Sequence, residues 1–78
     1  MYRIAGVEWS PLKLRELRQQ AGLTQGQLAQ YIGQPDVDKI RRWEHGDQVP
    51  GGAYILKLLL VLHAVPEDLL LRAYRTED

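Results

Sequence analysis

Five charged side chains lie within ten residues, "QPDVDKIRRW", of a chain of 78 residues. Three are cations, Lys39, Arg41 and Arg42, and two are acids, Asp36 and Asp38. Lysine and arginine bind phosphate oxygens, and the planar guanidinium of arginine also bonds the O6 and N7 atoms of guanine together. The segment therefore raises the hypothesis of a helix that binds a polyanion. The alternative is an ordinary solvated helix face.

Length and composition argue against catalysis. A single domain of this size buries only about 60% of its unfolded surface, so we expect no deep catalytic cleft. The chain has no cysteine, which excludes disulfides and thiolate zinc sites. Glu16, Glu44, His45 and His63 are the titratable candidates, but they match no nucleophile, metal or phosphate-loop spacing. We expect no enzyme activity, no cofactor and no metal.

Charge is balanced overall but unevenly distributed. The ten basic and ten acidic residues cancel, yet residues 1–45 hold seven Lys/Arg against five Asp/Glu, and residues 66–78 hold two against four. A polyanion is therefore expected to approach the first half of the chain. No apolar run reaches the roughly 18 residues of a membrane span, and the start lacks the pattern of a signal peptide. We expect a cytoplasmic protein.

Capping residues, prolines and glycines predict five short helices and no sheet. Ser10 and Pro11 predict the start of the first helix, Thr24 begins the "TQGQ" capping box of the second, and Asp36 can cap the third. Gly22, Gly33 and Gly46 are expected to end these helices, a fourth is predicted at about 53–63, and Pro66 opens a fifth through about residue 75. We expect one all-α domain over 1–78, with an N-terminal arm at 1–9 and a five-helix bundle at 10–75.

Several segments resemble a known family. "LRELRQQAGLTQGQLAQYIG", followed by "IRRWEHG" and "VPEDLL", is similar to the lambda-repressor/Cro-type (XRE-type) helix-turn-helix family over residues 12 to about 71. The region from "RRWEHG" onward is also similar to small autoregulators and antitoxins. The resemblance implies a five-helix DNA-binding domain with its helix-turn-helix at about 24–45 and a role as a transcriptional regulator or repressor.

The resemblance also implies roles for individual residues, with the third helix in the major groove of double-stranded DNA. The residues expected to read bases are Val37, Asp38 and Arg42, and those expected to contact phosphates are Thr24, Gln25, Lys39 and Arg41. Arg42 is the strongest candidate for guanine. The family further implies an ion pair between Arg18 and Glu44 that holds the third helix.

Two departures from the family pattern bear on these roles. The turn after Gly33 is one residue longer than is common, so Val37 belongs either to the core or to the groove face. Asp36 and Asp38 would repel phosphates, although Asp36 fits a helix cap and aspartate can accept a bond from cytosine N4.

Surplus apolar residues in the last two predicted helices indicate a contact surface. It comprises Leu56, Leu60, Val61, Leu71 and Tyr74. We expect a homodimer or a protein-partner site there, unless residues 1–9 fold over it. The alternative function is an antitoxin-like module that uses the same fold to bind a protein such as a toxin.

Overall fold

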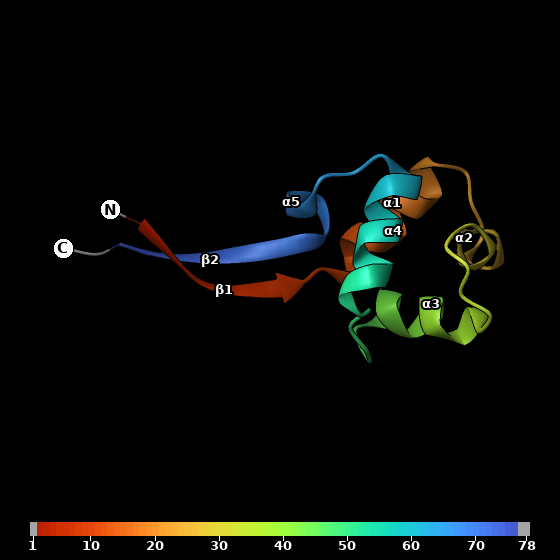
Figure 1. Cartoon of the computed structure of the whole chain (residues 1–78), viewed down its shortest axis with the longest axis horizontal. Coiled ribbons are helices and arrows are strands. Elements are labelled where there is room, and N and C mark those ends of the chain that lie inside the picture. The colour runs from red at the N-terminus through yellow and green to blue at the C-terminus, as the bar shows by residue number, and fades with distance from the viewer. Residues whose placement is uncertain (1, 77–78) are drawn as a thin grey trace.

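Five helices form the body of the molecule, and two strands form a ribbon that extends from it (Figure 1). The computed structural model describes residues 2–76, with side chains described for residues 8–70. The elements in chain order are β1 (Tyr2–Trp9), α1 (Pro11–Gln20), α2 (Gln25–Tyr31), α3 (Val37–His45), α4 (Gly52–Leu62), α5 (Pro66–Leu69) and β2 (Leu70–Thr76). The predicted five-helix, helix-turn-helix architecture is confirmed. No helix in the described range has the length and apolarity needed to cross a membrane.

Local capping sets the ends of α2 and α3 as the sequence predicts. The Thr24 hydroxyl accepts a bond from the Gln27 amide at 3.1 Å, and the Gln27 side chain accepts one from the Thr24 amide at 2.9 Å. Asp36 caps α3 by accepting the Asp38 amide at 3.0 Å. Gly46 follows α3 with φ 83°, a left-handed conformation that glycine adopts without steric cost.

The start of α1 depends on a long-range contact as well as on local sequence. Pro11 occupies the first helical position as predicted, but the Ser10 side chain makes no capping hydrogen bond. The Ser10 amide instead donates to the Leu69 carbonyl at 2.8 Å. The beginning of α1 is thereby tied to the end of α5.

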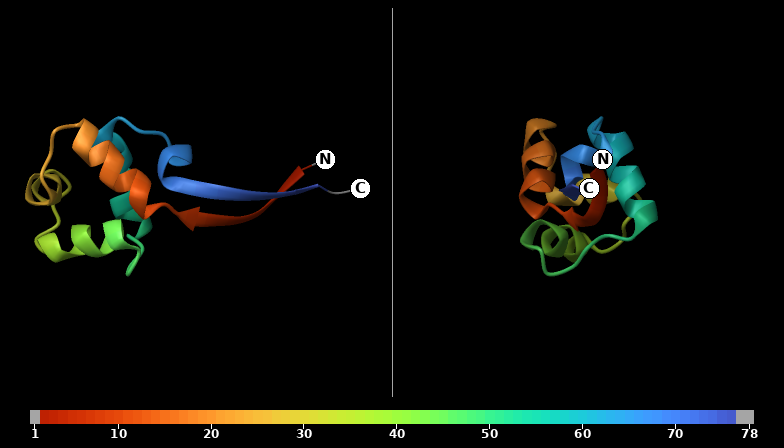
Figure 2. Two further views of the ribbon diagram at one scale, coloured as in Figure 1. Left: turned by 180° about the vertical axis from the view of Figure 1, so that it is seen from behind. Right: turned by 90° about the vertical axis from the view of Figure 1, so that its left-hand side faces the viewer.

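The strand pair corrects the prediction that the chain forms no sheet. Residues 1–9 were expected to be an arm, and the fifth helix was expected to reach about residue 75. In the structure α5 ends at Leu69, and the antiparallel pair of β1 and β2 runs from Trp9↔Leu70 to Tyr2↔Thr76. The ribbon extends away from the helices, so residues 2–9 do not cover the predicted contact surface on α4, which was the alternative to a dimer or a protein partner (Figures 1 and 2).

A β-bulge is one reason why β1 and β2 were not predicted from the sequence. Ile4 lies opposite Tyr74 and Gly6 lies opposite Ala73, which leaves one extra residue in β1 between them. The bulge breaks the alternation of period two that marks a strand. Residues 70–76 are rich in leucine, arginine and alanine, which favour helix locally, so only pairing with β1 makes this segment a strand.

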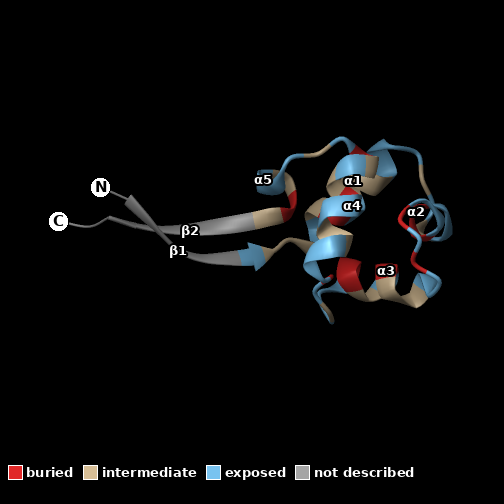
Figure 3. Ribbon diagram, in the orientation of Figure 1, coloured by how far each residue is buried: buried red, intermediate tan, exposed pale blue. Residues whose placement is uncertain are grey.

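The hydrophobic core lies among the five helices (Figure 3). Its buried members are Leu14, Leu28, Ala29, Ile32, Ile40, Trp43, Leu58, Leu62 and Leu69. Trp43 is only 3% exposed and packs against the Tyr54 ring at a centroid distance of 5.4 Å. Its carbonyl accepts a bond from the Trp9 indole at 2.8 Å, which attaches the base of the ribbon to α3. Trp43 is therefore a core residue.

Candidate nucleic-acid interface

Helix α3 has one buried side and one side that faces solvent. Ile40, Trp43 and Glu44 are buried against the rest of the domain. The exposed or half-buried residues of the same helix include all those predicted to face a nucleic acid: Val37, Asp38, Lys39, Arg41 and Arg42. Packing of the apolar side thus determines which charged residues are presented to a partner.

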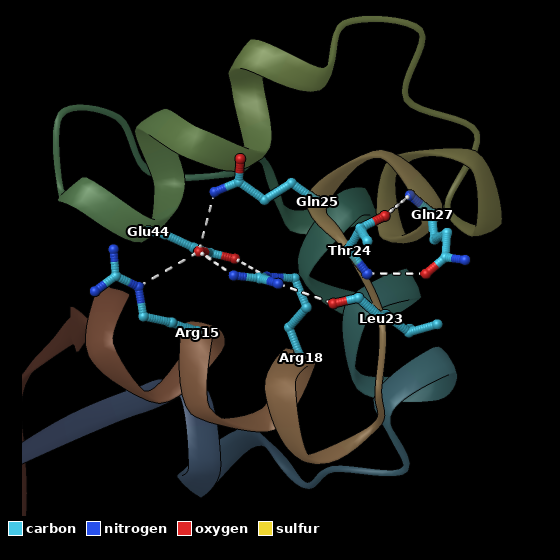
Figure 4. A network of polar contacts seen from close by, with 7 residues as sticks. All are labelled: Arg15, Arg18, Leu23, Thr24, Gln25, Gln27 and Glu44. Carbon is cyan, nitrogen blue, oxygen red and sulfur yellow. Dashed lines mark hydrogen bonds and ion pairs between the residues drawn. The ribbon is translucent and has the colours of Figure 1, made fainter.

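An ion pair between α1 and α3 anchors the buried side (Figure 4). Arg18 Nε donates to Glu44 Oε2 at 2.6 Å, and Arg18 Nη2 donates to Glu44 Oε1 at 3.1 Å. The remaining terminal nitrogen, Nη1, donates to the Leu23 carbonyl at 2.8 Å. The Glu44 side chain is 0% exposed and that of Arg18 is 12% exposed. These are the two residues that the family resemblance paired.

Two further side chains surround the Glu44 carboxylate. Gln25 Nε2 donates to Glu44 Oε1 at 3.2 Å, so the Gln25 amide nitrogen points toward the carboxylate of α3 and keeps its second N–H donor (Figure 4). Arg15 Nε lies 3.8 Å from the same oxygen, with a side chain that is 48% exposed. Arg15 was not among the predicted site residues. Its position three residues before Arg18, on the same side of α1, was the available signal.

A second carboxylate organises the solvent side of α3. Asp38 Oδ1 accepts a bond from Arg41 Nε at 2.7 Å, and Asp38 Oδ2 accepts one from Arg42 Nε at 2.7 Å. The hydrogen bond from Arg41 lowers the pKa of Asp38 and raises the pKa of Arg41. Two of the three predicted cations and one of the two acids therefore form one charged cluster.

The longer turn before α3 is occupied by a buried polar residue. Gln34 is buried, and its side chain accepts a bond from the Asp36 amide at 3.1 Å. Val37 is exposed at the start of α3, so of the two open possibilities for Val37 the core is excluded.

The remaining predicted phosphate contacts have partners within the protein. Lys39 Nζ lies 3.4 Å from Gln48 Oε1 in the loop after α3, and Gln48 was not predicted. Thr24 is exposed, with its hydroxyl engaged in the capping box.

The predicted contact surface is only partly contained in one helix. Leu56 and Leu60 of α4 are exposed, and Val61 is half-buried beside them. Leu60, Val61 and the exposed Tyr31 of α2 line a shallow hollow. Leu71 and Tyr74, expected in the fifth helix, lie in β2, and their side chains fall outside the described part of the structure.

Within residues 8–70, where side chains are described, no three histidine or acidic residues are placed to hold a metal ion. The chemistry present on α3 is that of hydrogen-bond donors with positive charge, which suits the phosphates and base edges of a nucleic acid.

Two short helices joined by a tight turn, with the second presenting cations, define the helix-turn-helix class of DNA-binding domain. The profile of the helix-turn-helix domain matches residues 12–73, so the chain belongs to this family, and it is of the XRE type. It is a DNA-binding regulator of transcription, in a family whose members are typically not enzymes.

A solved structure agrees with this assignment. The restriction-modification controller protein C.AhdI from Aeromonas hydrophila is 34% identical and superimposes with a TM-score of 0.68, over 74% of this chain and 86% of that one. A comparison with curated proteins found no significant match.

Proposed function

We propose that the chain is a sequence-specific, dimeric transcriptional repressor or autoregulator that reads the major groove of double-stranded DNA with α3. The observation that carries the proposal is the orientation of α3. Its apolar side is locked into the core by Trp43 and by the ion pair of Glu44, while Arg41 and Arg42 face solvent. A recognition helix needs this combination of rigid support and exposed donors.

Within this proposal the residues divide into two groups. Arg42 reads guanine, and Val37 at the start of α3 contacts a thymine methyl or another base edge. Thr24, Gln25, Lys39 and Arg41 position the domain on the phosphates. The half-exposed Arg15 beside Glu44 adds a cation close to the same surface.

Dimerisation would supply the affinity that one small domain lacks. Leu56 and Leu60 expose apolar surface on α4, and Tyr31 and Val61 lie next to it. A twofold dimer through this surface would bury it and would present two copies of α3 to a palindromic site. The likeness to C.AhdI supports the regulatory part of the proposal.

DNA binding by the full chain tests the reading function. The affinity for DNA from the protein's own promoter would be compared with that for a scrambled sequence of equal composition, at two salt concentrations. We expect tighter binding to the promoter and a fall in both affinities as salt rises, because phosphate contacts release counterions. Equal binding to both sequences would contradict sequence-specific reading.

Sedimentation of Leu60→Glu tests the dimer. We expect this variant to remain folded but to dissociate into monomers, because a charge in an apolar interface opposes association. Leu12→Glu is the matched control, since Leu12 of α1 is 64% exposed and Leu60 is 68% exposed. Equal association of both variants would show that α4 is not the interface.

The second candidate function is that of a protein-interaction module, such as an antitoxin. Two observations favour it: the net charge of zero and the exposed apolar surface of α4. Absence of DNA binding at low salt, together with an intact fold, would make this the better proposal.

A further inference from the structure

In the charged cluster on the solvent side of α3, Asp38, Arg41 and Arg42 are joined by specific hydrogen bonds and not only by proximity of opposite charges. Each oxygen of Asp38 bonds a different arginine, and both bonds come from Nε. Arg41 and Arg42 follow Asp38 by three and four residues, so all three side chains lie on one side of the helix within a single turn. The carboxylate therefore bridges two guanidinium groups.

The use of Nε leaves the recognition atoms of both arginines available. A guanidinium has five N–H donors, and only one of them is engaged in each arginine here. Among the residues whose side chains are described, the terminal nitrogens of Arg41 and Arg42 have no hydrogen-bond partner. Guanine O6 and N7 accept two bonds from one guanidinium. A guanidinium held at Nε is thus oriented while its terminal donors stay free.

We propose that Asp38 is a positioning residue for DNA recognition: it holds Arg41 and Arg42 by Nε so that the terminal nitrogens of Arg42 face the groove and those of Arg41 face the phosphates beside it. The inference rests on the proposed function of α3 as the reading helix. It replaces the role of base reader that the resemblance implied for Asp38, because each carboxylate oxygen already accepts a hydrogen bond from an arginine of the same helix.

This role predicts opposite effects on specific and non-specific binding. Without the carboxylate, the flexible arginines regain rotamer freedom, which must be lost again when they bind guanine. The same change removes a negative charge from a surface that faces phosphates, which strengthens binding to any sequence. Asp38→Asn should therefore weaken discrimination while it raises non-specific affinity.

The experiment begins with selection of preferred sequences from a randomised DNA pool by the unaltered full chain. Dissociation constants on the selected and on a scrambled sequence would then be measured for Asp38→Asn, Arg42→Ala and the double variant. We expect Asp38→Asn to bind scrambled DNA about two- to fivefold more tightly and to lose roughly fivefold or more in the ratio of the two affinities. In the Arg42→Ala background, Asp38→Asn should change that ratio much less, because the positioned group is absent.

The outcomes separate this inference from the proposed function. If Asp38→Asn strengthens binding equally on both sequences, Asp38 merely repels phosphate and the inference is overturned while reading by α3 stands. Additive losses in the double variant would also overturn it, since Asp38 would then act without Arg42. If the unaltered chain selects no sequence, the proposed function fails and the inference fails with it. Circular dichroism melting of each variant verifies that the fold is intact.

Discussion

The protein contains two carboxylate clusters of similar chemistry in different surroundings. Glu44 accepts two hydrogen bonds from Arg18, and Asp38 accepts one each from Arg41 and Arg42. Glu44 has no exposed side-chain surface, whereas the Asp38 side chain is 39% exposed. A buried ion is costly to leave unpaired, while an exposed one is readily solvated by water. The first cluster therefore holds the fold, and the second is free to serve recognition.

The largest expected effect is on stability. Arg18→Ala should lower the free energy of unfolding by about 3–5 kcal/mol, because the Glu44 carboxylate would remain buried without its main partner. Urea or thermal unfolding followed by circular dichroism measures it. Arg15→Ala is the matched control, since Arg15 is half-exposed and only 3.8 Å from Glu44, and it should cost under about 1 kcal/mol. Equal losses of unfolding free energy in the two variants would show that the Arg18–Glu44 pair does not hold the fold more strongly than an exposed ion pair does.

In the solvent-facing cluster the expected effect is on recognition. Arg42→Ala should lose about 1–3 kcal/mol of binding at its preferred base pair and relax discrimination there, with little change in melting temperature. Titrations of matched and single-substituted DNA measure it. Lys13→Ala is the control. Lys13 lies on α1 two positions before Arg15, which places it on the opposite side of that helix. Its removal takes away one positive charge and should leave the discrimination between DNA sequences intact. A preference that survives Arg42→Ala would remove Arg42 as a reader.

Gln25 is expected to contribute both to the stability of the fold and to DNA binding, each to a moderate degree. Its side chain bonds Glu44, and it is also expected to lie near a phosphate. Gln25→Ala should lower the free energy of unfolding by about 1 kcal/mol and should weaken binding to all DNA sequences by similar factors. Unfolding and DNA titrations on the same preparation test both effects. A change in the ranking of sequences would instead indicate that Gln25 contacts a base.

The smallest effect concerns the pKa of Asp38. Because the bond from Arg41 lowers this pKa, the carboxylate is stabilised in the folded protein. Its contribution is therefore present above the ordinary value of about 3.9 and is lost as pH falls through the lower folded value. Carbon-detected NMR titration should show a midpoint below that ordinary value, and Arg41→Ala should move it upward. An unchanged midpoint in Arg41→Ala would show that this bond does not form in solution.

Local signals predicted the helical part of the fold well. The capping box of Thr24 and Gln27, the Asp36 cap and Gly46 each act within a few residues, so their consequences are visible in the sequence. The spacing of Ile40 and Trp43 likewise indicated the buried side of α3, and from it the exposed positions of Arg41 and Arg42 followed. The family resemblance supplied the pairing of Arg18 with Glu44.

The strand ribbon and the polar contacts required the tertiary structure. Residues 70–76 favour helix locally and become β2 because a segment at the other end of the chain pairs with them across a bulge. Similarly, nothing near Gln25 in the sequence directs its amide to Glu44, nineteen residues away.

The sequence by itself determined where α2 and α3 begin and end, which side of α3 is apolar and which cations that helix can present, because these depend on short-range geometry. The folded chain decided the ribbon, the inward direction of Gln25 and the bridging of Arg41 and Arg42 by Asp38. In each of these three cases local preference allows several arrangements of interaction partners, and only one of them is found in the folded protein. Long-range pairing makes the first two choices, and the rotamers that the folded surface permits make the third.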